Sequence, residues 1–332
     1  MKAQNPPRAG GFFLTAVFLL LPLALSSYSS CAPNDGQTML GSSSSSSSDS
    51  TELDATVESA VGAANSALND AEKVSSYAFS APSRGSLIES AYAAGCGTSR
   101  FSPAIGTANC AGTENDRTVT ASFAGCTAGP GNEVTLTGAV TLAFDSAATC
   151  NTWISGSAFP GSGSVTRTMS SFARQNASGI KVTTDSNTHV NYLSESVGGG
   201  VVTTFGVSNR TIQISGLHRA RTLADGSAGF DHSVRTTEAL LVSGTKAGGT
   251  RKIASGAVRV DHNKLNYSAT TSFSNVTWSS TCCYPTGGTL TLLLSGSLSG
   301  AATANFNTGT CGRVSVIDVK GKASEAQLFS CE

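Results

Sequence analysis

The sequence predicts a mainly β fold: a long antiparallel, curved meander sheet that follows one N-terminal amphipathic helix and is stabilised by disulfides. Alternation of apolar and polar residues begins near Thr118 and recurs to the C-terminal end, as in half-buried strands. The connections are short and rich in Gly, as hairpins require, and no helical segments intervene, so parallel βαβ units are not expected. The chain has nine Cys, and those other than Cys31 form an even set that can pair completely.

Composition limits the classes of partner. The chain has 332 residues, with 21 basic and 21 acidic side chains, and only 13% of the residues are charged. Nucleic-acid binding depends on clustered Lys and Arg that neutralise phosphates, and no basic field of this kind is present. Low charge with abundant Gly, Ser and Thr is common in extracellular β proteins. We therefore expect no nucleic acid among the partners, and no cofactor.

An export signal begins the sequence. Lys2 and Arg8 precede an apolar run from Phe12 to Leu25, and small residues follow it. A membrane-spanning helix needs ~20 residues, so this run is too short, and Pro22 interrupts it. Residues 1–30 are therefore predicted to be a signal peptide.

The signal ends with Tyr28-Ser29-Ser30-Cys31, and Ala32 follows. This stretch resembles the lipobox of bacterial lipoproteins, although Tyr28 stands where that family has Leu or a similar aliphatic residue. The resemblance implies that Cys31 becomes the lipidated first residue and anchors the protein in a membrane. Ala32, which is not Asp, implies the outer membrane. The alternative is ordinary cleavage, which would give a secreted protein with a plain thiol at Cys31.

A tether and a helical segment are predicted next. Residues 31–50 contain the lipidated Cys and seven consecutive Ser, with too little apolar surface to fold, so they should form a flexible coil. Residues 51–115 are predicted to be a helical segment that packs on the sheet. Its first helix is indicated by apolar residues at helical spacing: Leu53, Val57, Ala60, Val61, Ala64, Leu68 and Ala71. A weaker helical stretch runs from Leu87 to Ala94, and Gly95 suits its C-terminal cap.

Residues 116–332 are predicted to form the antiparallel β domain. The alternating pattern predicts strands at Val134–Phe144, Lys181–Thr184, Val201–Phe205, Thr211–Leu217, Arg251–Ala254, Ala257–Val260, Leu265–Ala269, Thr289–Leu292 and Val314–Val319. A Gly recurs after a small polar residue in several of these segments, at Gly138, Gly216, Gly244, Gly256 and Gly296. Gly in a strand often marks a bulge or bend, which favours a curved sheet. In a chain with 36 Gly, chance placement is the competing explanation.

The other Cys residues are predicted to form disulfides in an oxidising compartment. They are Cys96, Cys110, Cys126, Cys150, Cys282, Cys283, Cys311 and Cys331. Sequence alone does not choose among the possible pairings. Proximity favours Cys96–Cys110 and Cys126–Cys150, and the likeness of segments 126–150 and 283–311 favours Cys283–Cys311, which leaves Cys282–Cys331.

The adjacent pair Cys282-Cys283 has a structural and a metal interpretation. The structural one is preferred, because no Cys-x-x-Cys pair accompanies it. Trp278 is expected to pack against this pair. The alternative is an exposed indole ring that stacks on a sugar.

Two of the four His, His232 and His262, each follow an Asp. Adjacent residues of a strand point to opposite faces, so neither Asp-His pair forms a site by itself. A metal site would need both His to converge from neighbouring strands, and polar residues on the wet face of a sheet are the simpler interpretation. No catalytic residue is assigned, because the chain has no Gly-x-Ser-x-Gly elbow, His-Glu-x-x-His or phosphate loop.

Together these features predict an envelope-anchored, non-enzymatic lipoprotein whose β domain serves binding, adhesion or envelope structure. Its expected partners are the membrane, through the lipid anchor, and an envelope protein, glycan or lipid ligand. One alternative is a carrier of lipid or another apolar ligand, in which the curved sheet encloses a cavity. A second is a hydrolase without a recognisable motif.

Overall fold

The computed structural model describes residues 56–57, 61, 101–102, 110, 117–128, 134–154, 161–245, 249–282 and 284–328. The chain divides into two units, Met1–Ser30 and Cys31–Glu332, and every described residue belongs to the second. The predicted signal peptide, the lipidation site Cys31, the Ser-rich tether and the helical stretch 87–94 lie outside the described residues. Within the described residues, no helix is both long enough and apolar enough to cross a membrane.

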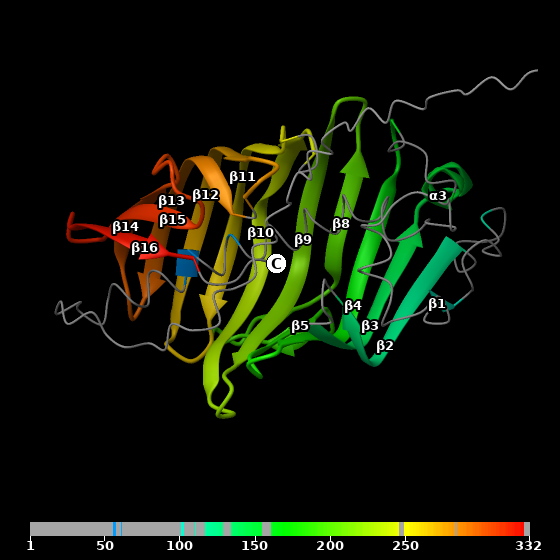
Figure 1. Ribbon diagram of the computed structural model, residues 1–332, viewed down its shortest axis with the longest axis horizontal. Helices are drawn as coiled ribbons and strands as arrows, with labels where there is room; N and C mark the ends of the chain where they lie inside the picture. Colours follow the sequence, from blue (N-terminus) through cyan, green and yellow to red (C-terminus); the bar gives the residue numbers. More distant parts are fainter. Residues whose placement is uncertain are drawn as a thin grey trace, which may run out of the picture. The chain divides into compact units, whose positions relative to one another are not determined.

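One antiparallel sheet of 14 strands accounts for most of the described chain (Figure 1). Its strands are β1 (Phe101–Ser102), β2 (Thr118–Ala128), β3 (Val134–Phe144), β4 (Ser164–Asn176), β5 (Lys181–Asp185), β8 (Gly200–Phe205), β9 (Asn209–Thr222), β10 (Ala228–Ser243), β11 (Lys252–His262), β12 (Tyr267–Trp278), β13 (Pro285–Gly296), β14 (Gly300–Asn305), β15 (Arg313–Ile317) and β16 (Ala323–Gln327). A separate two-stranded hairpin is formed by β6 (His189–Val190) and β7 (Ser196–Val197). The mainly β, antiparallel prediction is confirmed.

The strand order nearly follows the chain order. From β1 to β5, and again from β9 to β16, each strand pairs with the next one in sequence. The departure lies between β4 and β9, each of which pairs with β8 along its first half and with β5 along its second. The segment that carries the β6–β7 hairpin is therefore an insertion between β5 and β8.

One face of the sheet, which we call the inner face, carries the apolar core. A cross-strand row on β9–β13 shows this, because its members are direct neighbours and all are buried: Leu217, Val234, Val260, Ala269 and Leu294. Complete burial of such a side chain stabilises the fold by about 1.5–3 kcal/mol. The core is therefore built from alternate residues of each strand.

The predicted N-terminal helix is described at three positions. Thr56, Val57 and Val61 are helical and buried. Val57 and Val61 belong to the same core cluster as the inner face, and the Thr56 hydroxyl is hydrogen-bonded to the hydroxyl of Tyr267 on β12. The rest of this predicted helix lies outside the described residues.

Glycines mark irregular positions in the sheet, as predicted. At Gly138 the β3–β4 ladder shifts register, φ is 86°, and a Cβ would lie 2.3 Å from the backbone oxygen of Ser171. No other residue fits there without moving β4. The β10–β11 ladder also shifts around Gly256, while Gly296 ends β13 and Gly244 follows β10. The long strands β9 and β10 are bent along their length in Figure 1.

The expectation that no helix interrupts the strands is wrong. Helix α3 (Ala147–Ile154) lies between β3 and β4. The Ser146 hydroxyl accepts a hydrogen bond from the Thr149 amide at 3.1 Å, which caps the helix at its N-terminal end. This short Ser-x-x-Thr signal stands in a Ser- and Thr-rich chain, so it does not stand out in the sequence.

The predicted disulfide pairing is also wrong. The structure joins Cys110 to Cys150 and Cys282 to Cys311. Cys126 is disulfide-bonded too, to a partner outside the described residues. The predicted pairs Cys96–Cys110, Cys126–Cys150, Cys283–Cys311 and Cys282–Cys331 are each excluded by one of these bonds.

The register of the sheet explains the error for Cys126. This residue lies opposite Leu136, near the start of β3, whereas Cys150 follows the end of β3 at Phe144. Eight residues of a strand separate those two ends by about 26 Å, far more than a disulfide can bridge. Proximity in sequence therefore failed because the hairpin carries the two cysteines to opposite ends.

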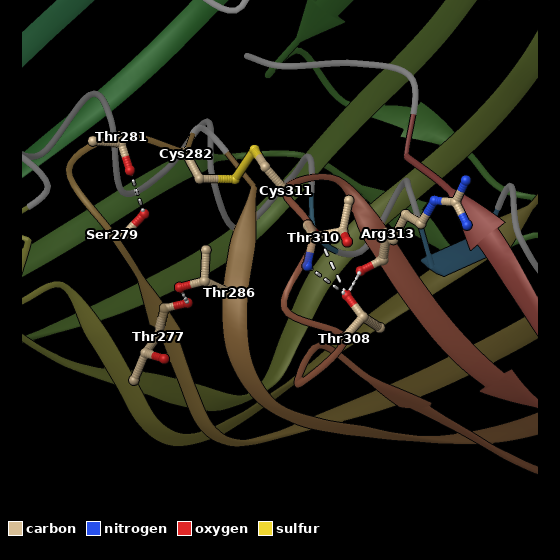
Figure 2. Close-up of a disulfide and its surroundings, with 9 residues drawn as sticks. All are labelled: Thr277, Ser279, Thr281, Cys282, Thr286, Thr308, Thr310, Cys311 and Arg313. Atoms are coloured by element: carbon tan, nitrogen blue, oxygen red, sulfur yellow. Dashed lines mark hydrogen bonds between the residues drawn. A yellow bond between two sulfur atoms is a disulfide. The ribbon is translucent and has the colours of Figure 1, made fainter.

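The second disulfide joins the segment before β13 to the turn before β15 (Figure 2). Hydroxyl groups organise that turn, where Thr308 Oγ1 donates to the backbone oxygen of Arg313 at 3.1 Å. Trp278 is buried in the core with the Arg251 guanidinium over its ring, so its indole is not exposed for stacking on a sugar. The structural interpretation is therefore confirmed for Cys282, which is disulfide-bonded, while Cys283 lies outside the described residues.

Candidate functional site

The face opposite the core, which we call the outer face, carries a row of polar residues across five strands. The row consists of direct cross-strand neighbours: Asp185, His218, Ser233, Asp261 and Ser268. The β6–β7 hairpin covers the middle of this row. Its backbone approaches the sheet at Gly216, where a Cβ would lie 2.3 Å from the amide nitrogen of Gly198. The absence of a side chain at Gly216 lets the hairpin lie against β9.

His189 fastens the first strand of the hairpin to β10. Its Nε2 atom is 2.7 Å from the Ser233 hydroxyl, which is fully buried. The amide of Asn263 also donates to this hydroxyl, at 3.2 Å. With neutral His189, a consistent arrangement has the Ser233 hydroxyl donating to Nε2.

A charged pair lies beside this contact. His218 Nε2 donates to Asp231 Oδ1 at 3.0 Å, and Asn263 donates to the same oxygen at 2.7 Å. The hydrogen bond from His218 lowers the pKa of Asp231 to about 2, although burial opposes the shift. The same bond raises the pKa of His218. Because both shifts favour the ionised forms, the pair is charged in mildly acidic solution.

The pKa of His189 is shifted in the direction opposite to that of His218. Its ring centroid lies 4.7 Å from that of His218. Burial, and the charge that His218 can carry, lower the pKa of His189, against the smaller effects of Asp231 and Asp185. Two neighbouring imidazoles thus differ in proton affinity, because one has a carboxylate partner and the other a hydroxyl.

A second set of contacts holds the hairpin over β11 and β12. Asn191 Nδ2 donates to Asp261 at 2.9 Å, and the hydroxyls of Tyr192 and Ser268 are 2.7 Å apart. Asp261, which is fully buried, also accepts from Arg259 at 2.7 Å and from Ser268 at 2.6 Å. A buried carboxylate needs such partners, because an unpaired one would cost several kcal/mol.

His232 and His262 do converge, but on the inner face. They are cross-strand neighbours with ring centroids 4.3 Å apart, and both are buried. Burial lowers the pKa of His262 to about 4 and that of His232 well below its usual range. The wet-face interpretation is therefore wrong for these two residues. Within the part of the chain that the structure describes, no group of three or more His, Cys, Asp or Glu is placed to hold a metal ion.

The separation of each Asp-His pair is as predicted. Asp231 bonds His218 on the outer face, whereas His232 stacks on Phe230 on the inner face. The sequence pattern points to His232 and gives no signal for the outer residues His189 and Ser233. Period-two alternation places Ser233 on the face of β10 opposite to that of His232. The insertion that brings His189 to Ser233 has no periodic pattern from which its fold could be predicted.

The Ser233–His189 contact resembles the nucleophile–base contact of hydrolases in one respect, the distance between the two groups. The Ser233 hydroxyl, however, lies beneath the hairpin with none of its surface exposed. A substrate cannot reach it while the hairpin is in place. The contact therefore serves to hold the hairpin on the sheet.

A second region of the outer face is open. Strands β12, β13 and β14 contain no charged residue and no His. Their exposed outward residues are mostly hydroxyl-bearing or amide side chains: Ser272, Ser274, Thr291, Leu293, Ser295, Ala301, Thr303 and Asn305. We call this set the hydroxyl face. Hydroxyls of neighbouring strands are in register at Ser272, Thr291 and Thr303.

Comparisons with protein-family models, with curated proteins and with solved structures gave no match. The geometry of the outer face, and the residues of the chain itself, therefore carry the functional argument.

Proposed function

We propose that this protein is an exported, lipid-anchored and non-enzymatic protein of the cell envelope, whose β domain binds a neutral, hydroxyl-rich partner such as a glycan. The observation that carries the proposal is the hydroxyl face. Three adjacent strands without a single charge are unusual on an exposed surface, where charged residues ordinarily dominate.

The spacing of these groups supports a repetitive ligand. Outward side chains recur at about 4.8 Å between strands and about 6.8 Å along them. Hydroxyls both donate and accept, so such a lattice can hydrogen-bond a neutral polysaccharide along its length. The exposed Leu293, at 57%, adds an apolar contact within the array.

A carrier function has less support. It requires apolar side chains around an open space, whereas the described apolar residues of the inner face, such as Met169 and Ile212, are buried in the core. The membrane anchor rests on the lipobox resemblance at Cys31.

Binding is tested with the full chain and an insoluble neutral polysaccharide in a pull-down assay. Thr291→Glu with Thr303→Glu places two charges on the hydroxyl face, and we expect binding to fall at least tenfold, because each carboxylate must be desolvated against a neutral ligand. Thr237→Glu, at an exposed site on β10, is the matched control. Equal binding by all variants, or none by the parent protein, would contradict the proposal.

Anchoring is tested separately. Cys31→Ser should release the protein from membranes or stop its processing, because the residue that carries the lipid is gone. Fractionation and intact-mass measurement check this. Unchanged mass and membrane association would falsify the lipid anchor without bearing on the hydroxyl face.

A further inference from the structure

The β6–β7 hairpin is fastened to the outer face in two places that differ in chemistry. Over β11 and β12 the fasteners are Asn191, which donates to Asp261, and Tyr192, whose hydroxyl is hydrogen-bonded to that of Ser268. Over β10 the fasteners are Glu195, which forms an ion pair with Arg235, and His189, whose bond to Ser233 lies beside the His218–Asp231 pair. Of these contacts, the one made by His189 is the one that a change of pH near neutrality can alter.

We infer that the β6–β7 hairpin is a latch, closed near neutral pH and opened when protonation of His189 sets two cationic rings side by side on the outer face. Protonation also makes Nε2 of His189 a donor. The Ser233 hydroxyl can then no longer donate to Nε2. Its other acceptor is Asn263 Oδ1, 3.4 Å from the Ser233 oxygen, which already accepts a hydrogen bond from the Tyr192 amide.

The sign of the effect follows from both histidines. A His with a lowered pKa in the closed state stabilises that state above its ordinary pKa of 6.5 and ceases to do so as the pH falls below it. His218 acts in the opposite sense, since its bond to Asp231 is favoured by protonation. Acid therefore loosens the hairpin while β9 and β10 stay paired.

Other charged groups around the latch do not reverse this direction. Asp185 and Asp231 favour a protonated His189, but burial and His218 outweigh them. On the hairpin and on β10, Glu195 pairs with Arg235. On β11, Asp261 pairs with Arg259. Within each pair the two charges compensate each other. His189 is therefore the group whose protonation changes the charge beside the hairpin.

Opening has a structural consequence on the outer face. It uncovers Ser233, Asp261 and Ser268, and the last of these is the cross-strand neighbour of Ser295 on the hydroxyl face. The latch thus controls how far the exposed polar surface extends across the sheet. This inference does not depend on what the hydroxyl face binds.

Hydrogen–deuterium exchange of the full chain at about pH 7.5 and about pH 5.5, corrected for intrinsic exchange rates, tests the latch. We expect amides of residues 186–199 to lose protection at the lower pH, by up to about tenfold, because pH 5.5 lies about one unit below the ordinary pKa of histidine. Amides of β13 and β14 should keep theirs, which shows that the sheet is still folded.

Two variants make the test specific. His189→Gln retains a group that can hydrogen-bond Ser233 but does not titrate, so protection of the hairpin should no longer depend on pH. Tyr192→Phe removes the bond to Ser268 and should lower protection by the same factor at both pH values. Protection of 186–199 that is independent of pH in the parent protein, or equally pH-dependent in His189→Gln, would overturn the latch.

Discussion

Asp231 shows how a single side chain sets the charge state of its surroundings. Its carboxylate accepts from His218 on β9 and from Asn263 beyond the end of β11, so it joins three successive parts of the sheet. Burial, and then the resulting charge on His218, lower the pKa of His189, one ring away, below that of an ordinary surface histidine. The pair therefore matters more for its neighbours than for its own contribution to stability.

Asp231→Asn tests this pair. The contribution of Asp231 is present above its ordinary pKa of 3.8 and is lost as the pH falls toward about 2. That of His218 is present below 6.5 and is lost as the pH rises through its raised pKa. Both side chains are about one-third exposed, so solvent screening limits the expected loss in unfolding free energy to about 1 kcal/mol near pH 5.

Denaturant unfolding near pH 5 and pH 9 measures the difference, and NMR titration of His218 should show its pKa falling in Asp231→Asn. Asp225→Asn, in the exposed β9–β10 turn, is the control. An equal loss of stability at both pH values would mean that the carboxylate acts by shape rather than by charge.

The elements differ in how far the sequence predicts them. The segment Val134–Phe144 was predicted with the bounds of β3, because its alternation is regular. Strand β14 was missed, since its residues Gly300–Asn305 are mostly Ala and Gly, which have low strand propensity. Residues 251–254 and 257–260 were predicted as two strands, although β11 runs through both with a bulge at Gly256.

The site was less predictable than the strands. The comparable positions of His232 and His262 in neighbouring strands allowed their convergence, but the wet-face interpretation was preferred and is wrong. The partnership of His189 with Ser233 depends on how a 14-residue insertion, 186–199, folds back over the sheet, and no local periodicity encodes that contact. The predicted disulfide pairing failed for a related reason, since strand register decides which cysteines lie close together.

The disulfide Cys282–Cys311 is tested by two adjacent substitutions. Cys282→Ser should lower the free energy of unfolding by about 3 kcal/mol, because a loop of 29 residues is no longer closed in the unfolded chain. Cys283→Ser should leave the Cys282–Cys311 cross-link intact, as non-reducing peptide mapping will show. A peptide that joins Cys283 to Cys311 in the parent protein would contradict the assignment.

At the scale of the whole molecule, the described core recruits residues from both ends of the chain. Val57 and Val61 contribute to the same cluster as Val314 and Leu328. The described core therefore draws on residues separated by most of the chain length.

A chain that begins at Thr51 should unfold in one cooperative transition with the stability of the full chain, since the Ser run that is removed has no apolar side chain to bury. In that shortened chain Val57→Ala should cost about 2 kcal/mol, because the side chain is completely buried. Thermal and denaturant unfolding check both. A shortened chain without a cooperative transition would show that the preceding residues have a structural role.

The double pairing of β9 also bears on the order in which the chain can assemble. The sheet on either side is built from neighbours in sequence, whose contacts close short loops and form quickly. The pairings of β9 with β5 and of β8 with β4 instead span the intervening hairpin. Until they form, the strands up to β5 and the strands from β8 onward are two separate ribbons. These two pairings are thus the seam at which the ribbons join, and the slowest step of folding is expected there.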